Sequence, residues 1–541
     1  MTEVFLVVIA AVILASIILN IVSTHIGVPA LLAFMTLGIL FSRWGILPER
    51  VENMSIAKET CSIALIFIMF YGGFGTRYES AKPVFREAVL LSSLGVVLTA
   101  LLVGLFCRLA LGWGWLESLL FGSVMGSTDA ASVFSVLRSK RLGLKNNTAP
   151  LLEVESGSND PAAFMLTSIV LSLMNGSADG GKVVLLIFEQ LFFGAVFGVV
   201  IAKLAVYAIR RLHFPTDGLN SLFVLAVALA SYALPSFVNG NGYLSAYIVG
   251  VILGNEDFDD KRSMVNFFDG ITGLMQVFIF FQLGLLVKVQ NLPQAILPAL
   301  AIFAFMFLIA RPVSVFSLLG FNRRFSRCQN ALISFVGLRG ASSIVFAIVA
   351  MVGAPILQND LFNIAFIIVI ISIALQGSLI PLAARKLGMV DKASDVMKTF
   401  NDYVEGGVVN FGSVKVDAES AWNGLKISEL KLPKEMLIVL IIRAGERIQP
   451  RGDSVILAGD QLILMARAFA DKNTYLKEKT IKPTSRRVGN RIADHPGKGL
   501  VVLVRRGEQN IIPNGDTILQ AGDRIIFLTI ESDNKKAIDN N

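Results

Sequence analysis

Long apolar segments dominate the first two thirds of the chain. Runs long enough to cross a lipid bilayer recur from Phe5 to about Ala384. A transmembrane helix needs about 20 mostly apolar residues, and the core of a soluble protein has no use for so many such runs. Only 16% of the 541 residues are charged, against about 25% in a typical soluble domain. The sequence therefore predicts a polytopic α-helical membrane protein.

Thirteen transmembrane helices are predicted, joined by short loops rich in Gly, Pro and Asn. Their approximate centres are Ile13, Ala33, Leu65, Val97, Val124, Leu166, Val196, Ala226, Val249, Phe278, Phe305, Ile344 and Ile370. With the N-terminus outside, Lys and Arg concentrate in the inner loops, as the positive-inside rule requires. The start of the chain lacks the basic region of a cleaved signal peptide. We therefore expect a multi-pass protein of the cell inner (plasma) membrane with a cytoplasmic C-terminal tail.

The tail, from about Asp391, changes to a soluble α/β pattern and contains an internal repeat. The first copy runs from Ile441 to Leu464 and the second from Leu503 to Phe527. Each copy predicts strand, turn, strand, turn, strand, because apolar β-branched runs alternate with Gly-Asp and Pro-containing turns. We expect a membrane domain over 1–390 and two small repeats over 391–475 and 476–541. Such modules could sense a ligand or only dimerise as a scaffold.

Ionisable and hydroxyl side chains gather in the fifth and sixth predicted spans. Charged groups inside a membrane are costly and usually functional. The residues concerned are Thr128, Asp129, Glu153, Glu155, Ser156, Asn159 and Asp160. Their oxygen atoms suit a hard monovalent cation, and the carboxylates can hold protons when the cation has left. One site with two competing occupants is the minimum requirement for exchange. A single intramembrane Asp could instead be a structural helix contact.

Two arginines lie in later spans. Arg339 stands in the twelfth span and needs a carboxylate partner, for which Glu155 is the candidate. Arg311 in the eleventh span could assist the site or clamp backbone carbonyls, and both interpretations stay open. Small residues interrupt two spans, at Gly126–Ser127 and Gly337–Gly340. Paired interruptions indicate inverted repeats around a site at the membrane midplane, built from two broken crossing helices.

Other function classes find little support. His25, His213 and His495 lie in unrelated segments, so no metal site is expected beyond the monovalent cation. No phosphate-binding loop of an ATP-driven pump and no dinucleotide-binding fingerprint is present. The net charge of +8 is attributed to inner loops, and no nucleic-acid partner is expected. The sequence predicts a transporter and not an enzyme.

The motifs resemble the NhaP-like branch of the monovalent cation/proton antiporter superfamily. The matching strings are GVPALLAFMTLGIL, STDAAS, ESGSND, ARPVSV and GLRGASS, in the expected order. The resemblance implies a homodimer of thirteen-span protomers and an ion site at Asp129 and Asp160, with Thr128, Ser156 and Glu155 nearby. It also implies a buried Glu155–Arg339 ion pair. Asn159 before Asp160 is typical of electroneutral members.

The chain departs from the family at one position. Members often carry an acidic residue in the third span before a Gly-Gly pair, where this chain has Tyr71. An acidic contribution from this span to the ion path is therefore in doubt.

The tail repeats resemble the C-terminal (RCK C-terminal type) domain of potassium-conductance regulators. That resemblance implies control by a small ligand, with cyclic di-AMP as a candidate, and no other cofactor. Together the features predict electroneutral K⁺ or Na⁺/H⁺ exchange by alternating access, regulated by the tail. Potassium is favoured because of the tail. The alternative is a ligand-regulated cation channel or a transporter-like sensor.

Overall fold

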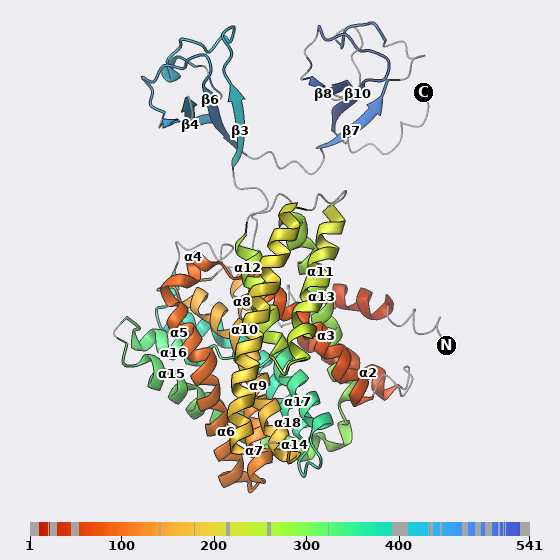
Figure 1. The fold of residues 1–541 in the computed structure, drawn as a ribbon, viewed down its shortest axis with the longest axis vertical. Helices are drawn as coiled ribbons and strands as arrows, with labels where there is room; N and C mark the ends of the chain where they lie inside the picture. The colour runs from red at the N-terminus through yellow and green to blue at the C-terminus, as the bar shows by residue number, and fades with distance from the viewer. Residues whose placement is uncertain are drawn as a thin grey trace. The chain divides into compact units, whose positions relative to one another are not determined.

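The computed structural model divides the chain into two compact units, Met1–Tyr403 and Val404–Asn541. It describes residues 10–19, 21, 30–44, 53–139, 142–177, 179–211, 217–256, 261–322, 324–391, 409–430, 432, 436–443, 446–448, 450–467, 474–481, 488–492, 500–506, 509–511, 513 and 516–530. The first unit is helical and the second consists mainly of strands (Figure 1).

Helices form where the apolar runs were found. In chain order the first half has Ala10–Leu19, α2 (Ala30–Arg43), α3 (Met54–Gly75), α4 to α6 (Tyr78–Leu111, with short 3₁₀ and π segments), α7 (Trp115–Val124), α8 (Ala130–Ser139) and α9 (Thr148–Met174). The second half has α10 (Gly180–Arg211), α11 (Asp217–Ser236), α12 (Gly242–Asn255), α13 (Lys261–Leu286), α14 (Leu292–Phe305), η5 (Met306–Ala310), α15 (Arg311–Leu319), α16 (Arg327–Phe335), α17 (Ala341–Gly353), α18 (Leu361–Ile371), η6 (Ser372–Gly377) and α19 (Ser378–Lys386). Each of the predicted span centres lies in one of these helices.

Not every predicted span is one long helix. Within the described residues, seven continuous helices are long and apolar enough to cross a membrane. The centres Val124 and Ile344 instead fall in shorter helices, α7 and α17, which belong to interrupted pairs. The polytopic helical fold is confirmed. The shorter apolar helices, of 10–17 residues, are Ala10–Leu19, α2, α7, α12 and α17.

The two predicted interruptions are present. The backbone is non-helical between α7 and α8, at Met125–Asp129, and between α16 and α17, at Val336–Gly340. The two unwound segments lie against each other, because the Asp129 N–H donates to the Leu338 carbonyl at 2.8 Å. Two broken helices crossing at their breaks match the inverted-repeat arrangement expected from the glycine positions.

Several helix pairs approach so closely that only glycine fits between them. On α12, a Cβ atom at Gly250 or Gly254 would overlap the carbonyl oxygen of Phe70 or Phe74 on α3. Small residues at such contacts let helices pack by van der Waals attraction where no hydrophobic effect drives them together. The α3–α12 contact is therefore set by backbone-to-backbone packing.

We predict that Gly250→Ala destabilises the membrane unit by about 1–3 kcal/mol, the usual cost of overpacking a tight contact. The matched control is Gly72→Ala on α3, where a Cβ meets no atom within 4 Å. Alanine favours a helix over glycine by up to about 1 kcal/mol, so the control should be neutral or stabilising. Thermal unfolding in detergent measures both variants. Equal melting temperatures would contradict the close packing.

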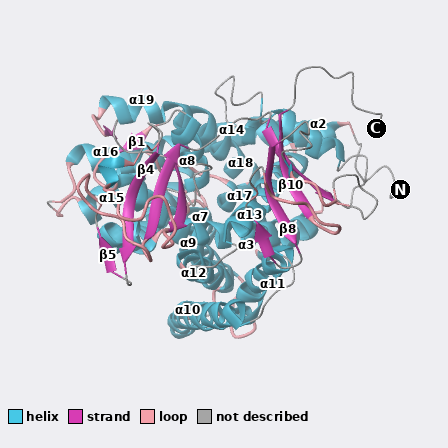
Figure 2. Cartoon of the chain, turned by 90° about the horizontal axis from the view of Figure 1, so that it is seen from above, coloured by secondary structure: helices cyan, strands magenta, loops and turns pink. Residues whose placement is uncertain are grey.

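The tail contains two antiparallel four-stranded sheets (Figure 2). The first has the order β3-β6-β4-β5, with β3 Val409–Lys415, β4 Met436–Arg443, β5 Glu446–Ile448 and β6 Gln461–Arg467. The second has the order β7-β10-β8-β9, with β7 Thr474–Thr480, β8 Leu500–Arg506, β9 Gln509–Ile511 and β10 Arg524–Ile530. The first and last runs predicted for each copy form strands, and the first run folds as a hairpin, β4–β5 or β8–β9. The predicted middle strand is wrong in both copies, because the run between the two turns makes only an isolated bridge, at Val455 or Ile518. The domain boundaries at 390 and 475 remain predictions.

An ion pair between a partly exposed arginine and a buried aspartate is repeated in the two sheets. Arg443 binds Asp460 through Nε–Oδ1 and Nη2–Oδ2 contacts of 2.8 Å each. Arg506 binds Asp523 in the same way, at 2.9 and 2.8 Å. Each carboxylate also accepts a backbone N–H from three residues earlier, at 2.8 Å. The arginine hydrogen bonds lower the pKa of both aspartates below the usual value. The aspartate of each Gly-Asp turn seen in the sequence therefore ties that turn to an arginine on a strand of the same sheet, and we call this pair the Arg–Asp anchor.

We predict that Asp460→Asn lowers the stability of the first sheet at pH 7 by about 1–3 kcal/mol, through loss of charge-assisted hydrogen bonds. Because the folded-state pKa is lowered, this stabilisation is complete well above pH 4 and is lost as the pH falls through the lowered pKa. Variant and parent should therefore converge only below the lowered folded-state pKa of Asp460, which lies under the usual value of about 3.9. Backbone hydrogen exchange of β6 in the full chain measures the change. The second sheet is the internal control, and equal changes in β10 would contradict a local role.

Candidate ion-binding site

Asp129 sits at the end of the first unwound segment, just before α8. Its Oδ2 accepts the Ser132 hydroxyl at 2.5 Å, and its Oδ1 accepts the Ser132 N–H at 3.3 Å. The carboxylate packs directly on Gly340 of the second unwound segment, where any Cβ would overlap it. Asp129 is therefore held by both broken helices at once, by α8 through Ser132 and by the other break through Leu338 and Gly340.

Asp160 approaches the same crossing from the middle of α9. It is 4% exposed and accepts a short hydrogen bond from the Ser127 hydroxyl. The Ser127 hydroxyl also lies 2.9 Å from that of Ser342 on α17. Asp160 and Asp129 interact electrostatically. The two aspartates predicted from the sequence therefore meet at one place, although they come from different helices.

Pro161 follows Asp160 inside α9. Proline has no N–H, so the helical hydrogen bond to the carbonyl four residues earlier, that of Gly157, is not made. The Pro161 carbonyl in turn accepts the Asn241 side chain at 2.8 Å. The helix that carries Asp160 therefore has a locally opened backbone beside the carboxylate.

Thr128, Ser156 and Asn159 link the first unwound segment to α9. Asn159 donates from Nδ2 to the Thr128 hydroxyl at 2.5 Å, and the Ser156 hydroxyl donates to the Thr128 carbonyl at 2.5 Å. All three are buried. The sequence-predicted set thus lies together, and its oxygen atoms face a buried junction of α8, α9 and the two breaks.

Glu155 has a different arginine partner from the one expected. Its Oε1 accepts Arg311 Nη2 at 2.5 Å, with both side chains almost fully buried. Arg339, expected to form this pair, instead donates to the Ser127 carbonyl. The two arginines therefore exchange the roles considered for them. The physical reason is position: Arg339 lies within the crossing, where the C-terminal end of the α7 segment presents carbonyls with partial negative charge.

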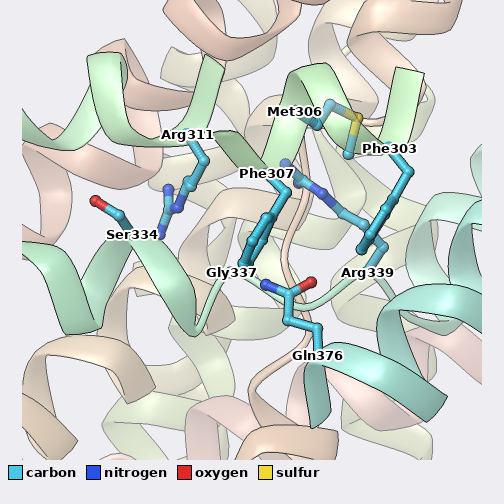
Figure 3. A pocket seen from close by; sticks show the side chains of 8 residues that line it. All are labelled: Phe303, Met306, Phe307, Arg311, Ser334, Gly337, Arg339 and Gln376. Carbon is cyan, nitrogen blue, oxygen red and sulfur yellow. The ribbon is translucent and has the colours of Figure 1, made fainter. Parts of the chain in front are cut away.

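Two small cavities, each with room for about one water molecule, flank this junction. The first is bounded by Arg311, Arg339, Gln376 and the aromatic side chains of Phe303 and Phe307 (Figure 3). The second is bounded by Asp129, Thr128, Glu155, Ser156 and their apolar neighbours. Arg311 and Gly337 border both cavities. Figure 3 shows Arg311 and Arg339 reaching the first cavity from separate elements.

Sequence reasoning missed several members of the site. Ser127 binds Asp160, Ser132 binds Asp129, and Ser342 bonds the hydroxyl of Ser127. They stood within the strings GSTDAAS and GLRGASS, so a search for hydroxyls one to three residues from each break would have found them. The contact of Asp129 with the Leu338 carbonyl had no sequence signal, because backbone atoms carry none.

We predict that Arg311→Met alone destabilises the protein by about 3–5 kcal/mol, because it leaves the Glu155 charge buried and unpaired. The double variant Arg311→Met with Glu155→Gln removes both charges and should recover most of this loss. Thermal unfolding of the parent, the two single variants and the double variant forms a double-mutant cycle. Additive losses in the double variant would contradict the pair.

Comparison with known proteins gives a consistent picture. The family described as "Sodium/hydrogen exchanger, transmembrane" matches residues 9–386, and the TrkA-C domain matches residues 412–468 and 476–539. The K(+)/H(+) antiporter NhaP of Alkalimonas amylolytica is 33% identical over 465 residues, covering 85% of this chain and 80% of that protein. The K(+)/H(+) antiporter NhaP2 of Shewanella oneidensis is 34% identical over 457 residues, covering 83% and 79%.

A solved structure supports the fold assignment. The sodium proton antiporter MjNhaP1 from Methanocaldococcus jannaschii superposes with a TM-score of 0.62 at 25% identity, covering 71% of this chain and 99% of that one. The match covers a share of this chain similar to that of the helical unit. The crossing broken helices, the buried carboxylates and these matches lead to one conclusion: the chain belongs to the sodium/hydrogen exchanger transmembrane family and carries a TrkA-C tail.

Proposed function

We propose that this protein exchanges a monovalent cation, K⁺ in preference to Na⁺, for protons, and that Asp129 and Asp160 bind both. The observation that carries the proposal is their joint position where two unwound segments cross. Glu155 is neutralised by Arg311, so its charge serves the structure. The carboxylates of the two aspartates accept hydrogen bonds from serine hydroxyls, and an incoming cation readily displaces these bonds.

The site has the ligands that a dehydrated alkali cation needs. Carboxylate oxygens of Asp129 and Asp160, with the hydroxyls of Thr128 and Ser156, supply hard oxygen donors close together. Asn159 orients Thr128 by its hydrogen bond. When the cation leaves, one proton takes its place on the aspartate pair, so that one positive charge replaces another, because an uncompensated pair of buried anions is costly. Cation and proton therefore compete for one site.

Electroneutral exchange and alternating access belong to the same proposal. Asn159 contributes no charge next to Asp160, so the site carries one carboxylate fewer than an Asp-Asp pair would. The two breaks, joined by the hydrogen bond from the Asp129 N–H to the Leu338 carbonyl, offer an element that can move as a unit. Potassium is preferred because two relatives at 33% and 34% identity are named K(+)/H(+) antiporters.

The assembly and location are proposed with it. We expect a homodimer in the cell inner membrane, with the tail in the cytoplasm, where a small anionic ligand such as cyclic di-AMP would regulate exchange. The TrkA-C match supports a regulatory role for the tail. Tyr71, in place of an acidic residue, donates from its hydroxyl to Asp269 at 3.3 Å, so a carboxylate from α13 lies beside this position.

We predict that Asp160→Asn abolishes exchange, because only one of the two carboxylates for which the cation and the proton compete then remains. Dequenching of a pH dye in proteoliposomes, on addition of KCl or NaCl, measures it. Glu189→Gln is the matched control, since it removes a carboxylate from α10, a membrane helix that contributes no residue to the proposed site. Full exchange by Asp160→Asn would overturn the site. A steady current in reconstituted bilayers would favour the channel alternative.

A further inference from the structure

A two-stranded ribbon pairs the loop between α8 and α9 with the segment that follows α19, near the end of the membrane unit. β1 (Gly143–Leu144) lies between α8 and α9, and β2 (Val390–Asp391) follows α19. They pair antiparallel, Gly143 opposite Asp391 and Leu144 opposite Val390. β2 is the last described element before the chain continues through residues 392–408 to the first tail sheet.

The ribbon is attached to both helices that carry the aspartates. α8 begins directly after Asp129, and α9 contains Asp160. At the α8 side, the Leu142 N–H donates to the Leu137 carbonyl at 2.9 Å. At the α9 side, the Lys145 carbonyl accepts the Thr148 hydroxyl at 2.6 Å. A displacement of β1 therefore moves the end of α8 and the beginning of α9 together.

β2 is held to β1 by polar contacts outside the two paired residues. The Lys145 N–H donates to the Met389 carbonyl at 2.9 Å, and the Lys145 ammonium donates to the Gly388 carbonyl at 3.0 Å. Gly388 has a positive φ of 66°. The Gly388 N–H bonds the Arg385 carbonyl and the Met389 N–H bonds the Ala384 carbonyl, the hydrogen bonds of a Schellman motif. The chain is thus turned sharply from α19 into the ribbon.

The ribbon also packs into a buried apolar cluster that reaches the crossing. Leu142, Leu144 and Met389 share this cluster with Leu338 of the second break. Leu338 is the residue whose carbonyl accepts the Asp129 N–H. The same cluster contains Leu137 of α8, Leu332 of α16 and Ile380 of α19. Side chains of the ribbon are therefore in one packed group with the backbone that holds Asp129.

We infer that the β1–β2 ribbon is the element through which the tail changes the ion site. Force or order imposed on the chain after Asp391 acts on β2, through it on β1, and through β1 on α8 and α9. By linkage, cation binding at the aspartates acts back on the ribbon. This inference rests on the proposed regulatory role of the tail, and it specifies the route that regulation takes.

The functional test measures K⁺/H⁺ exchange in proteoliposomes and compares altered chains with the full-length protein. A chain ended after Asp391 reports whether the tail alters K⁺/H⁺ exchange at all; a coupling of the usual size gives a change of about 5-fold or more. Six Gly/Ser residues inserted directly after Asp391 keep the tail but lengthen the segment that attaches it to β2. We expect this insertion to give the rate of the tail-deleted chain. The same insertion between Arg467 and Thr474, beyond the first sheet, should keep the full-length rate.

The outcomes separate the two proposals. An unchanged rate on tail deletion overturns the regulatory function itself. A changed rate on deletion, with the parent rate retained by the insertion after Asp391, overturns the ribbon and means that the tail acts by another route.

A second variant tests the ribbon without touching the linker. Gly388→Ala strains the turn into β2, because alanine disfavours positive φ, while its Cβ meets no atom within 4 Å. Gly112→Ala is the matched control, since Gly112 ends α6 at a φ of 74° in equally open space. We expect Gly388→Ala to speed hydrogen exchange at the Lys145 amide and to reduce the effect of tail deletion. Equal effects of both variants would overturn the inference.

Discussion

An unwound backbone inside a membrane has to find its hydrogen-bond partners within the protein, because lipid supplies none. The rest of the membrane unit is arranged around this requirement. The two breaks satisfy each other in part, through the Asp129 N–H and the Leu338 carbonyl. Arg339 and the hydroxyls of Thr128 and Ser127 complete the junction. Polar groups that the broken backbone needs are the same groups that can hold an ion.

Charge is divided between two tasks in this junction. The Glu155–Arg311 pair is buried on both sides and closes on itself, so it fixes the distance between α9 and α15. Arg339 donates to the backbone carbonyl of Ser127 rather than to a carboxylate. The two aspartates, which have hydroxyl neighbours, are the acidic groups that can exchange a cation for a proton. Structural and exchangeable charges are therefore separated by only one or two helical turns.

Much of this architecture could be predicted from sequence, for physical reasons. Apolar runs reveal helices because the bilayer imposes their length, and the small residues at Gly126 and Gly337–Gly340 mark breaks because few residues tolerate them. The arginine partner of Glu155 could not be predicted in the same way. Arg311 and Arg339 are both buried arginines, and only the crossing of the helices decides which one reaches Glu155. Likewise, Ser132 and Ser342 lie in ordinary small-residue strings, and their roles depend on the fold.

The twin sheets of the tail have a consequence for how such a protein can change over time. Each sheet contains its own Arg–Asp anchor and its own turn hydrogen bonds, so neither copy borrows an anchor from the other. After a duplication, one copy can therefore accumulate substitutions on its exposed face while the other keeps its original surface. A single gene could acquire a new effector specificity in one module without forfeiting the fold of either.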